Sequence, residues 1–233
     1  MKLSKRLEMV ASFVERGSRI ADIGTDHGYL PIALIERGVS PGAIAMDIGQ
    51  GPLARAKEHV LACGMEDKIE LRLSDGLAEL KPGEADSVVI AGMGGEMVLH
   101  ILEQGRALWE STGAFVLSPQ SELDKVRIYL EKNGFCIARE AMVFEDGKFY
   151  TVMLAKRGRM SLGRPAYYLY GKYLMEARDS VLALYLEKEK ARMQAILREL
   201  EGQETKKAQE AREKLLCELG WIKEVQDEMQ GDY

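Results

Sequence analysis

The sequence predicts an α/β fold in which a mostly parallel β-sheet ends in an antiparallel hairpin and is followed by a helical hairpin. Three observations predict this fold. From about residue 17, short apolar runs alternate with helical patterns, as in a sheet built from right-handed crossovers. Asp146-Gly147 then joins two further strand-like runs. After about Pro165 the strands cease, and the chain becomes rich in Glu, Lys, Arg, Leu and Ala.

The sheet is expected to start with five parallel strands covered by helices on both faces. The strands are 19–23, 43–47, 69–73, 87–91 and 114–117, and the helices cover roughly 30–37, 53–63, 96–104 and 122–133. Two antiparallel strands, 136–144 and 149–156, follow them. This order of elements resembles the Rossmann-like sheet of class I S-adenosylmethionine-dependent methyltransferases. An NAD-type sheet would continue with more parallel strands.

The remaining sequence predicts a short coiled-coil hairpin of two antiparallel helices. A composition break at residues 156–159 separates it from the sheet, so the expected domains are 1–158, which binds the cofactor, and 159–233, which is helical. Gly202 separates two sets of apolar residues at helical spacing. The sets are Leu182, Leu186, Met193, Ile196 and Leu200, then Ala208, Ala211, Leu215, Leu219 and Ile222.

Composition narrows the function classes. With 233 residues, of which 46% are hydrophobic, the chain can bury one sizeable core and a small second module. The net charge of −5 speaks against a protein coated in positive charge, although a local basic patch stays open. We expect no signal peptide or membrane span, and a cytoplasmic protein. Three distant cysteines argue against disulfides and zinc and are expected to be packing residues, namely Cys63, Cys136 and Cys217.

A glycine-rich turn follows the first strand. In Asp22-Ile23-Gly24-Thr25-Asp26-His27-Gly28, the glycines allow the backbone to pass close to a ligand. We expect Gly24 and Gly28 to lie under the methionine end of an adenosyl cofactor and Asp22 to bind its ammonium group. The same residues also suit a tight strand-to-helix turn with capping Asp side chains.

Acidic residues also end the second and third strands. Asp47, followed by Ile48, can accept two hydrogen bonds from ribose hydroxyls. Asp75-Gly76 offers a carboxylate beside an exposed backbone amide, which matches the amine and ring nitrogen of adenine. Acidic turns after three consecutive strands predict an adenosyl-cofactor site.

Gly92-Met93-Gly94-Gly95 follows the fourth strand, where many nucleic-acid amino-methyltransferases carry Asn-Pro-Pro-Tyr. No side-chain amide is available here, so backbone carbonyls and Asp26 are expected to face the acceptor. This points away from an exocyclic amine that must lose a proton. The glycines would also suit a helix that starts close to the sheet.

Other residues are candidates for contact with the acceptor. His27 lies in the cofactor loop beside Asp26, and Tyr29 and Tyr150 can stack on a base, although aromatic residues at such positions are often core. Lys5 and Arg6 belong to a basic cluster at the amino end, and a second basic cluster spans residues 148–164. They would track phosphates if both clusters flank the cleft. The three histidines share no metal-ligand spacing, and we expect no metal.

Four segments together resemble the bacterial tRNA (adenine(22)-N1)-methyltransferase family. They are Leu3-Ser4-Lys5-Arg6-Leu7, Ala21-Asp22-Ile23-Gly24-Thr25-Asp26-His27, Asp47-Ile48-Gly49-Gln50-Gly51-Pro52-Leu53 and Ala91-Gly92-Met93-Gly94-Gly95. The resemblance runs from the amino terminus through Arg157, and the helical tail is similar in kind to that family's coiled coil. Gly28, where many members carry Ala, and Ser118-Pro119-Gln120 depart from the family pattern.

The resemblance implies methyl transfer from S-adenosylmethionine to N1 of adenine 22 in the D-arm region of tRNA. It assigns catalysis to Asp26, His27 and the Gly92-Met93-Gly94 backbone. N1 bears a lone pair and no proton, so alignment matters more than a general base. We expect a monomer or weak homodimer.

Two other functions remain open. One is a methyltransferase for a small metabolite, in which the tail serves only dimerisation. The other is a non-catalytic RNA-binding scaffold or cofactor sensor that retains the fold. Salt-sensitive tRNA binding would favour a tRNA methyltransferase, whereas a closed lid over the pocket would favour a methyltransferase for a small metabolite.

Overall fold

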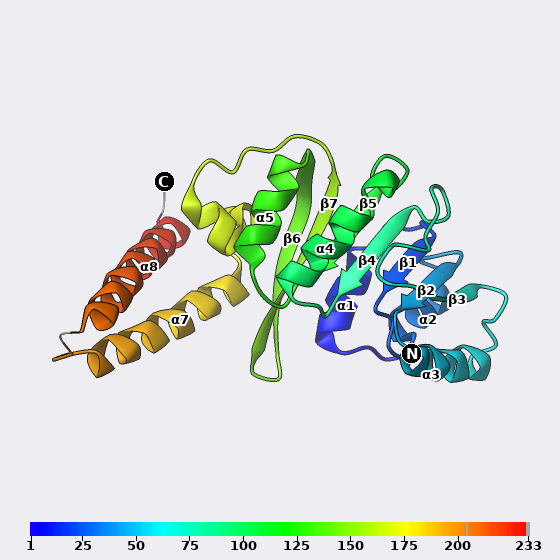
Figure 1. Cartoon of the computed structure of the whole chain (residues 1–233), viewed down its shortest axis with the longest axis horizontal. Coiled ribbons are helices and arrows are strands. Elements are labelled where there is room, and N and C mark those ends of the chain that lie inside the picture. The colour runs from blue at the N-terminus through cyan, green and yellow to red at the C-terminus, as the bar shows by residue number, and fades with distance from the viewer. Residues whose placement is uncertain (204, 232–233) are drawn as a thin grey trace. The chain divides into compact units, whose positions relative to one another are not determined.

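The computed structural model describes residues 1–203 and 205–231, which divide into two compact units, Met1–Leu162 and Gly163–Tyr233. The first unit is a seven-stranded sheet with helices on both faces (Figure 1). Its elements are α1 (Lys5–Ser12), β1 (Ile20–Ile23), α2 (Tyr29–Glu36), β2 (Ala43–Asp47), α3 (Gln50–Ala62), β3 (Ile69–Leu73), β4 (Ser87–Ala91), α4 (Gly95–Gln104), the 3₁₀-helix η1 (Arg106–Leu108), β5 (Ala114–Ser118), α5 (Leu123–Lys132), β6 (Phe135–Glu145) and β7 (Lys148–Arg157).

The strand order is β3-β2-β1-β4-β5-β7-β6, with the first five strands parallel and β7 antiparallel to both of its neighbours. The predicted parallel sheet with a terminal antiparallel pair is therefore confirmed. Asp22 of β1 is in register with Ala45 of β2 on one side and with Val89 of β4 on the other. Because the chain leaves β1 and β4 in opposite directions, their carboxyl ends form the switch point where ligands bind in such sheets.

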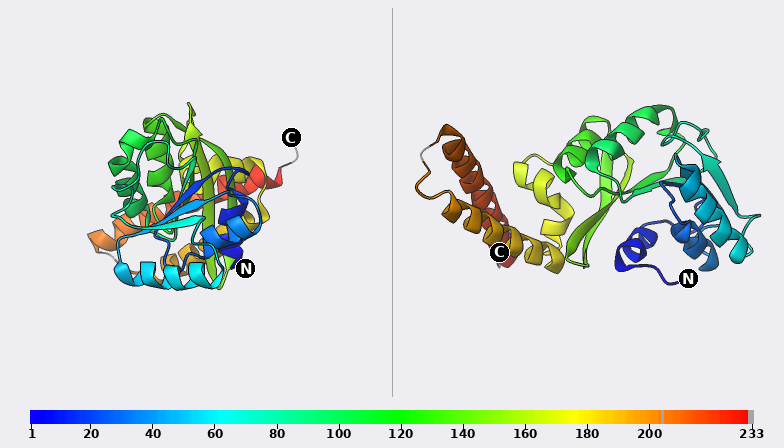
Figure 2. Two further views of the ribbon diagram at one scale, coloured as in Figure 1. Left: turned by 90° about the vertical axis from the view of Figure 1, so that its right-hand side faces the viewer. Right: turned by 60° about the horizontal axis from the view of Figure 1, so that its bottom comes forward.

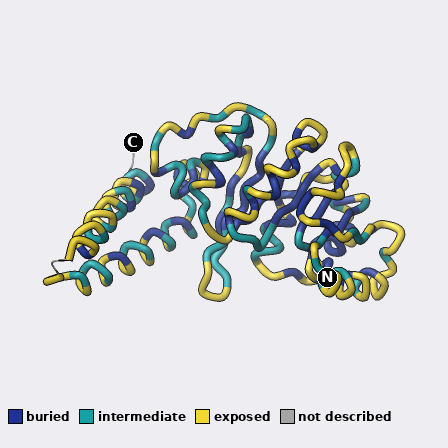
Figure 3. Tube along the Cα trace, in the orientation of Figure 1, coloured by how far each residue is buried: buried dark blue, intermediate teal, exposed yellow. Residues whose placement is uncertain are grey.

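Alternate residues of each strand face opposite layers of the core. In β1, Ala21 and Ile23 pack with α4 and α5, whereas Ile20 packs with α1 and α2. Figure 3 shows the buried residues concentrated along the strands of this unit. Since both faces are covered, the central strands are apolar on both sides and form a rigid support for the loops at their ends.

Two helices differ from the sequence prediction. No helix is predicted before the first strand, yet residues 5–12 form α1. The Ser4 side chain caps it by accepting from the Leu7 N–H, and its first two N–H groups, of Lys5 and Arg6, donate to the Glu145 carboxylate at 2.6 and 3.0 Å. Its start is therefore held by a local cap and by a partner about 140 residues away. Helix α3 begins at Gln50, three residues earlier than predicted, because the proline falls in its first turn, where no intrahelical N–H is needed.

The second unit contains the π-helix η2 (Tyr167–Gly171), α6 (Lys172–Glu176), α7 (Ser180–Glu199) and α8 (Lys206–Gln230). Figures 1 and 2 show α7 and α8 side by side, in agreement with the predicted helical hairpin. The Asp179 carboxylate caps α7 by accepting from two backbone N–H groups at 2.9 Å. The first periodic set supplies the buried Leu182, Leu186 and Met193, while α8 continues past Ile222 to bury two residues outside the predicted set, Val225 and Met229.

Among the described residues, no helix combines the length and apolar character that a membrane span needs. All three cysteines are free thiols. Cys63 and Cys217 are exposed, so the expectation that the cysteines are packing residues is wrong for these two. Cys63 follows the last residue of α3 and Cys217 lies within α8. On an amphipathic helix, burial depends on the position around the helix.

Candidate active site

A cavity of about 170 Å³ opens at the switch point between β1 and β4. Figure 1 shows these strands at the centre of the sheet. The cavity collects residues from α1, the end of β1, the start of α2 and the end of β4. They are Arg6, Leu7, Asp22, Gly24, Thr25, Asp26, His27, Tyr29, Leu30 and Ala91.

Asp22 is the buried acid of this cavity. It is 7% exposed, and burial, with the charge of Asp47 adding to it, raises the pKa of its carboxyl from 3.8 to about 6. A carboxylate in this position is destabilised by the loss of water. An ammonium group placed against it would restore the lost solvation, so the cavity favours a cationic ligand.

Two glycines shape the turn that follows Asp22. Gly24 has a φ of +80°, and a Cβ built on it would collide with the Cε of Met93. Gly28, with a φ of +69°, precedes α2. The positive φ at both positions favours glycine, and the side chain of Met93 uses the space that Gly24 leaves.

The neighbouring strand ends carry the other predicted cofactor residues. Asp47 accepts the Gly49 N–H through Oδ1 at 2.7 Å. Ile48 is 69% exposed, an unusual position for a large apolar side chain. Asp75 is exposed and Gly76, with a φ of +55°, is buried. These residues lie at the ends of β2 and β3, along the same edge of the sheet as Asp22.

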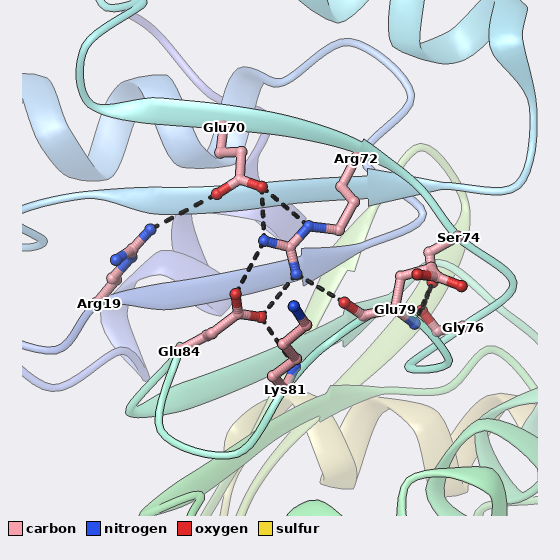
Figure 4. A network of polar contacts seen from close by, with 8 residues as sticks. All are labelled: Arg19, Glu70, Arg72, Ser74, Gly76, Glu79, Lys81 and Glu84. Carbon is pink, nitrogen blue, oxygen red and sulfur yellow. Dashed lines mark hydrogen bonds and ion pairs between the residues drawn. The ribbon is translucent and has the colours of Figure 1, made fainter.

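A network of ion pairs holds the loop that carries Asp75 and Gly76 (Figure 4). Arg72 of β3 pairs with Glu70 at 2.5 Å and with Glu84 at 2.6 Å, and it also donates to the carbonyl of Glu79 at 2.7 Å. The hydrogen bonds of Arg72 and the Lys81 N–H lower the pKa of Glu84 to about 2. Arg72 therefore links β3 to the loop that follows it, through Glu79 and Glu84.

Asp26 lies at the mouth of the cavity and is paired with Arg55 of α3. This hydrogen bond, with the charge of His27 adding to it, lowers the pKa of the Asp26 carboxyl. The Nε2 of His27 lies 3.5 Å from the second carboxylate oxygen. Sequence reasoning missed Arg55, because nothing in the α3 sequence indicates which face of that helix turns toward residue 26.

Three aromatic rings stack beside Asp26. The three ring centroids form a triangle: Tyr29 lies 5.0 Å from both His27 and His59, with inclinations of 7° and 26°, and the two histidine rings lie 5.5 Å apart. His59 Nδ1 also lies 2.9 Å from the His27 carbonyl oxygen. Tyr29 is 38% exposed, so one large aromatic surface remains open at the cavity. His59 is a second site residue that sequence reasoning did not single out.

The glycine-rich turn after β4 forms another part of the site. Gly92 has a φ of +87°, and a Cβ on it would lie 3.2 Å from the guanidinium of Arg6 and 3.8 Å from the amide of Gln120. The backbone N–H of Gly92 donates to the Ser118 carbonyl at 3.1 Å. Gly94 precedes α4, and a Cβ on it would lie 3.3 Å from the Ser121 hydroxyl. That Arg6 and Gln120 both lie close to Gly92 was not predicted from the sequence.

The four predicted substrate residues do not all gather here. Arg6 and Tyr29 line the cavity, and the Arg6 guanidinium lies 5.5 Å from the centre of the Tyr150 ring. Lys5 lies instead in a groove on the other side of α1. Adjacent residues on a helix point about 100° apart, which is why one basic segment divides between two surfaces.

In the second basic cluster, three cations are paired with acids. Lys156 pairs with Glu15 at 2.6 Å and Arg157 with Glu110 at 3.1 Å, while Arg164 belongs to the second unit and pairs with Glu228. Within residues 1–203 and 205–231, no three His, Cys, Asp or Glu side chains form a group suited to a metal ion.

Comparison with known proteins gives a consistent result. Residues 3–153 match a family model described as a methyltransferase domain. The tRNA (adenine(22)-N(1))-methyltransferase of Bacillus subtilis (strain 168) is 34% identical over 97% of this chain and 98% of its own length.

Two solved structures are similar over the whole chain. One is a protein of Streptococcus pneumoniae described as a putative tRNA (m1A22) methyltransferase, with a TM-score of 0.90 and 37% identity over 97% of this chain and all of the other. The same protein in complex with S-adenosyl-L-methionine has a TM-score of 0.87 and 35% identity, with the same coverage.

Proposed function

The chain belongs to the tRNA (adenine(22)-N1)-methyltransferase family, and from this premise we propose that it transfers a methyl group from S-adenosylmethionine to N1 of adenine 22 in bacterial tRNA. The observation that carries the proposal is the cavity at the switch point. It combines a buried carboxylate, a glycine with positive φ, Gly24, and a partly exposed aromatic ring, Tyr29.

The residues present fit an adenosyl cofactor. Asp22 would bind the ammonium group, and the backbone at Gly24 and Gly28 would lie under the methionine end. Asp47 would accept hydrogen bonds from the ribose hydroxyls, with Ile48 against the adenine ring and Asp75-Gly76 at its polar edge. When bound, this cofactor supplies an electrophilic methyl group on a sulfonium sulfur.

The acceptor side suits a nitrogen that carries no proton. N1 of adenine uses its lone pair to form the new bond, the methyl–sulfur bond breaks with its electron pair staying on sulfur, and the base becomes cationic. Asp26, held in place by Arg55, and the backbone carbonyls of residues 92–94 would accept hydrogen bonds from the 6-amino group as its charge grows. No side chain is required to remove a proton.

Substrate contacts would come from the aromatic rings and Arg6. N1 is hidden in a paired or stacked adenine, so the nucleotide must turn out of its stack to be methylated. Tyr29, clustered with His27 and His59, would offer an aromatic surface for the extruded base. Arg6, above Tyr150, would bind a neighbouring phosphate.

The predicted domains keep these roles in the proposal. Residues 1–158 would bind S-adenosylmethionine and catalyse the transfer, and the helical hairpin in residues 159–233 would add a second surface for tRNA. We place the protein in the cytoplasm, where its tRNA substrate occurs, as a monomer or weak homodimer.

The decisive experiment offers labelled S-adenosylmethionine and unmodified bacterial tRNA to the protein, followed by mapping of the methylated nucleotide. We expect label at N1 of adenine 22, and none on a transcript in which that adenine is replaced by guanine. Label at another nucleotide, or on small metabolites only, would overturn the assignment. Uptake of S-adenosylhomocysteine without transfer to any tRNA would instead indicate a non-catalytic scaffold.

A further inference from the structure

Helix α1 separates two hollows in the surface of the first unit. Arg6 and Leu7 line the cavity at the switch point, whereas the opposite side of the helix borders a groove of about 520 Å³. The other wall of this groove is β6, the edge strand of the sheet. The groove is lined by Lys2, Leu3, Lys5, Glu8, Met9, Ser12, Phe13, Arg139, Ala141 and Val143.

The cations of the groove are free to meet a partner. Within the described residues, neither Lys2 nor Lys5 has an acidic side chain within ion-pair distance. The Arg139 guanidinium lies 4.2 Å from the centre of the Phe13 ring and donates to the Ser12 carbonyl at 3.0 Å. Arg139 is therefore held in place, and among residues 1–203 and 205–231 it forms no ion pair.

The acids near the groove are already engaged. Both oxygens of Glu8 accept hydrogen bonds from Arg37, at 2.6 and 2.7 Å, and these bonds lower the pKa of Glu8. Both oxygens of Glu145 accept the N–H groups at the start of α1, which lowers its pKa too. Glu8 is thus neutralised by Arg37, while Glu145 stays anionic; Lys2, Lys5 and Arg139 outnumber it, so the net charge of the groove is positive.

The groove at the other edge of the sheet has a different character. It measures about 660 Å³ between α3 and β3, and its charged lining residues are Lys57, Glu66 and Glu70. In a chain with a net charge of −5, an unneutralised basic rim occurs at one edge and not at the other. Moreover, the basic groove is the one that shares a helix with the proposed acceptor site.

We propose that the groove between α1 and β6 binds the RNA strand that flanks the methylated nucleotide. Lys2, Lys5 and Arg139 would contact phosphates, and the apolar floor would contact sugar and base faces. The inference rests on the proposed function, because it extends the path of the substrate from Arg6 across α1. A cationic rim over an apolar floor suits a single strand better than a duplex, whose bases are covered.

The test compares two double variants of the full chain. Lys2→Gln/Lys5→Gln removes two cations of the groove, and Lys57→Gln/Lys68→Gln removes two exposed cations at the other edge. Affinity for unmodified tRNA is measured by filter binding at several salt concentrations. We expect the groove variant to lose about 5- to 30-fold in affinity and to flatten the slope of log K against log salt by about 1–2, since each phosphate contact contributes about 0.7–0.9.

Steady-state kinetics then locate the loss. The groove variant is expected to show a raised KM for tRNA and an unchanged affinity for S-adenosylhomocysteine in calorimetry, whereas the control variant matches the wild type in both. Arg139→Gln, checked for its melting temperature, gives an independent reading of the same surface.

The outcomes separate the two proposals. If the wild type methylates tRNA and the groove variant has the KM and salt slope of the control, the groove does not bind RNA. If the wild type methylates no tRNA, the proposed function fails, while the salt slope of RNA binding still reports on the groove. Binding of a polyglutamate peptide that is lost in the groove variant, with tRNA binding unaffected, would assign the surface to a protein partner and overturn the inference.

Discussion

Replacement of Asp22 by asparagine separates stability from cofactor binding. Burial raises the pKa of Asp22 from 3.8 to about 6, a difference of about two pH units, which corresponds to a cost of about 3 kcal/mol for the ionised carboxylate in the folded protein. Asparagine has the same shape and no charge. We therefore expect Asp22→Asn to stabilise the folded protein at neutral pH while abolishing cofactor binding.

The stabilisation expected for Asp22→Asn depends on pH. Below pH 3.8 the carboxyl is protonated in both the folded and unfolded states, so it carries no penalty. The penalty develops between pH 3.8 and about 6 and is complete above that range. The difference in stability between the variant and the wild type should therefore be small at about pH 4 and reach about 3 kcal/mol at about pH 8.

Calorimetric melting of the two proteins measures this difference. A gain of about 3 kcal/mol in a domain of this size corresponds to a rise in Tm of about 6–12 °C at pH 8. Asp75→Asn, which removes an exposed carboxylate, is the control and is expected to stay within about 1 °C of the wild type. Saturating S-adenosylhomocysteine should raise the Tm of the wild type and leave that of the Asp22→Asn protein unchanged.

Two results would refute the reasoning. A variant that melts at or below the wild-type temperature at pH 8 would show that the buried carboxylate is stabilised by its surroundings rather than strained by them. A Tm difference that stays constant between pH 4 and pH 8 would show that ionisation of Asp22 does not limit stability.

Three further predictions concern neighbouring positions. Asp47→Ala should weaken S-adenosylhomocysteine binding about 10- to 100-fold, because the loss of hydrogen bonds to a carboxylate costs about 1.5–3 kcal/mol, whereas Asp26→Ala should mainly lower kcat; equal losses of affinity in calorimetry would contradict this division. Gly24→Ala should lower the Tm more than Gly38→Ala, because both residues have positive φ but only the first would meet a side chain; equal losses would show that the methionine above the turn moves freely aside. Arg72→Met should lower both Tm and cofactor affinity at pH 7. The variant and the wild type should converge in stability as the pH falls from 4.5 toward 2, because Glu84, whose pKa Arg72 lowers to about 2, then takes up its proton. A stability difference that persists at pH 2 would assign the effect to packing.

The strands and the placement of acidic residues at their carboxyl ends were accessible from the sequence. The runs at 43–47, 69–73 and 87–91 have the predicted bounds. Two of them are apolar and end at Asp47 and before Gly92, and the third alternates apolar with charged residues up to Leu73. Once the strands are parallel, the acidic residues that follow them meet at one edge of the sheet. A local pattern therefore determines which residues share that edge.

The acceptor side depends on contacts between distant segments. Arg55 reaches Asp26 from a helix 29 residues later, and the start of α1 is fixed by Glu145. The division of Lys5 and Arg6 between two surfaces follows from the helix that carries them. Periodicity over a few residues reports none of these pairings, since each is set by the packing of elements on the completed sheet.

The bond between the start of α1 and Glu145 has a consequence for synthesis. Glu145 leaves the ribosome 140 residues after Lys5, which at about 5–20 residues per second is a delay of about 7–30 s. During that interval Arg6 has been synthesised, but the helix that carries it is not yet fixed. The segment that carries Arg6 is thus made before the residue that holds it in place, and a growing polypeptide does not complete the cavity lined by Arg6 before the hairpin of β6 and β7 has emerged.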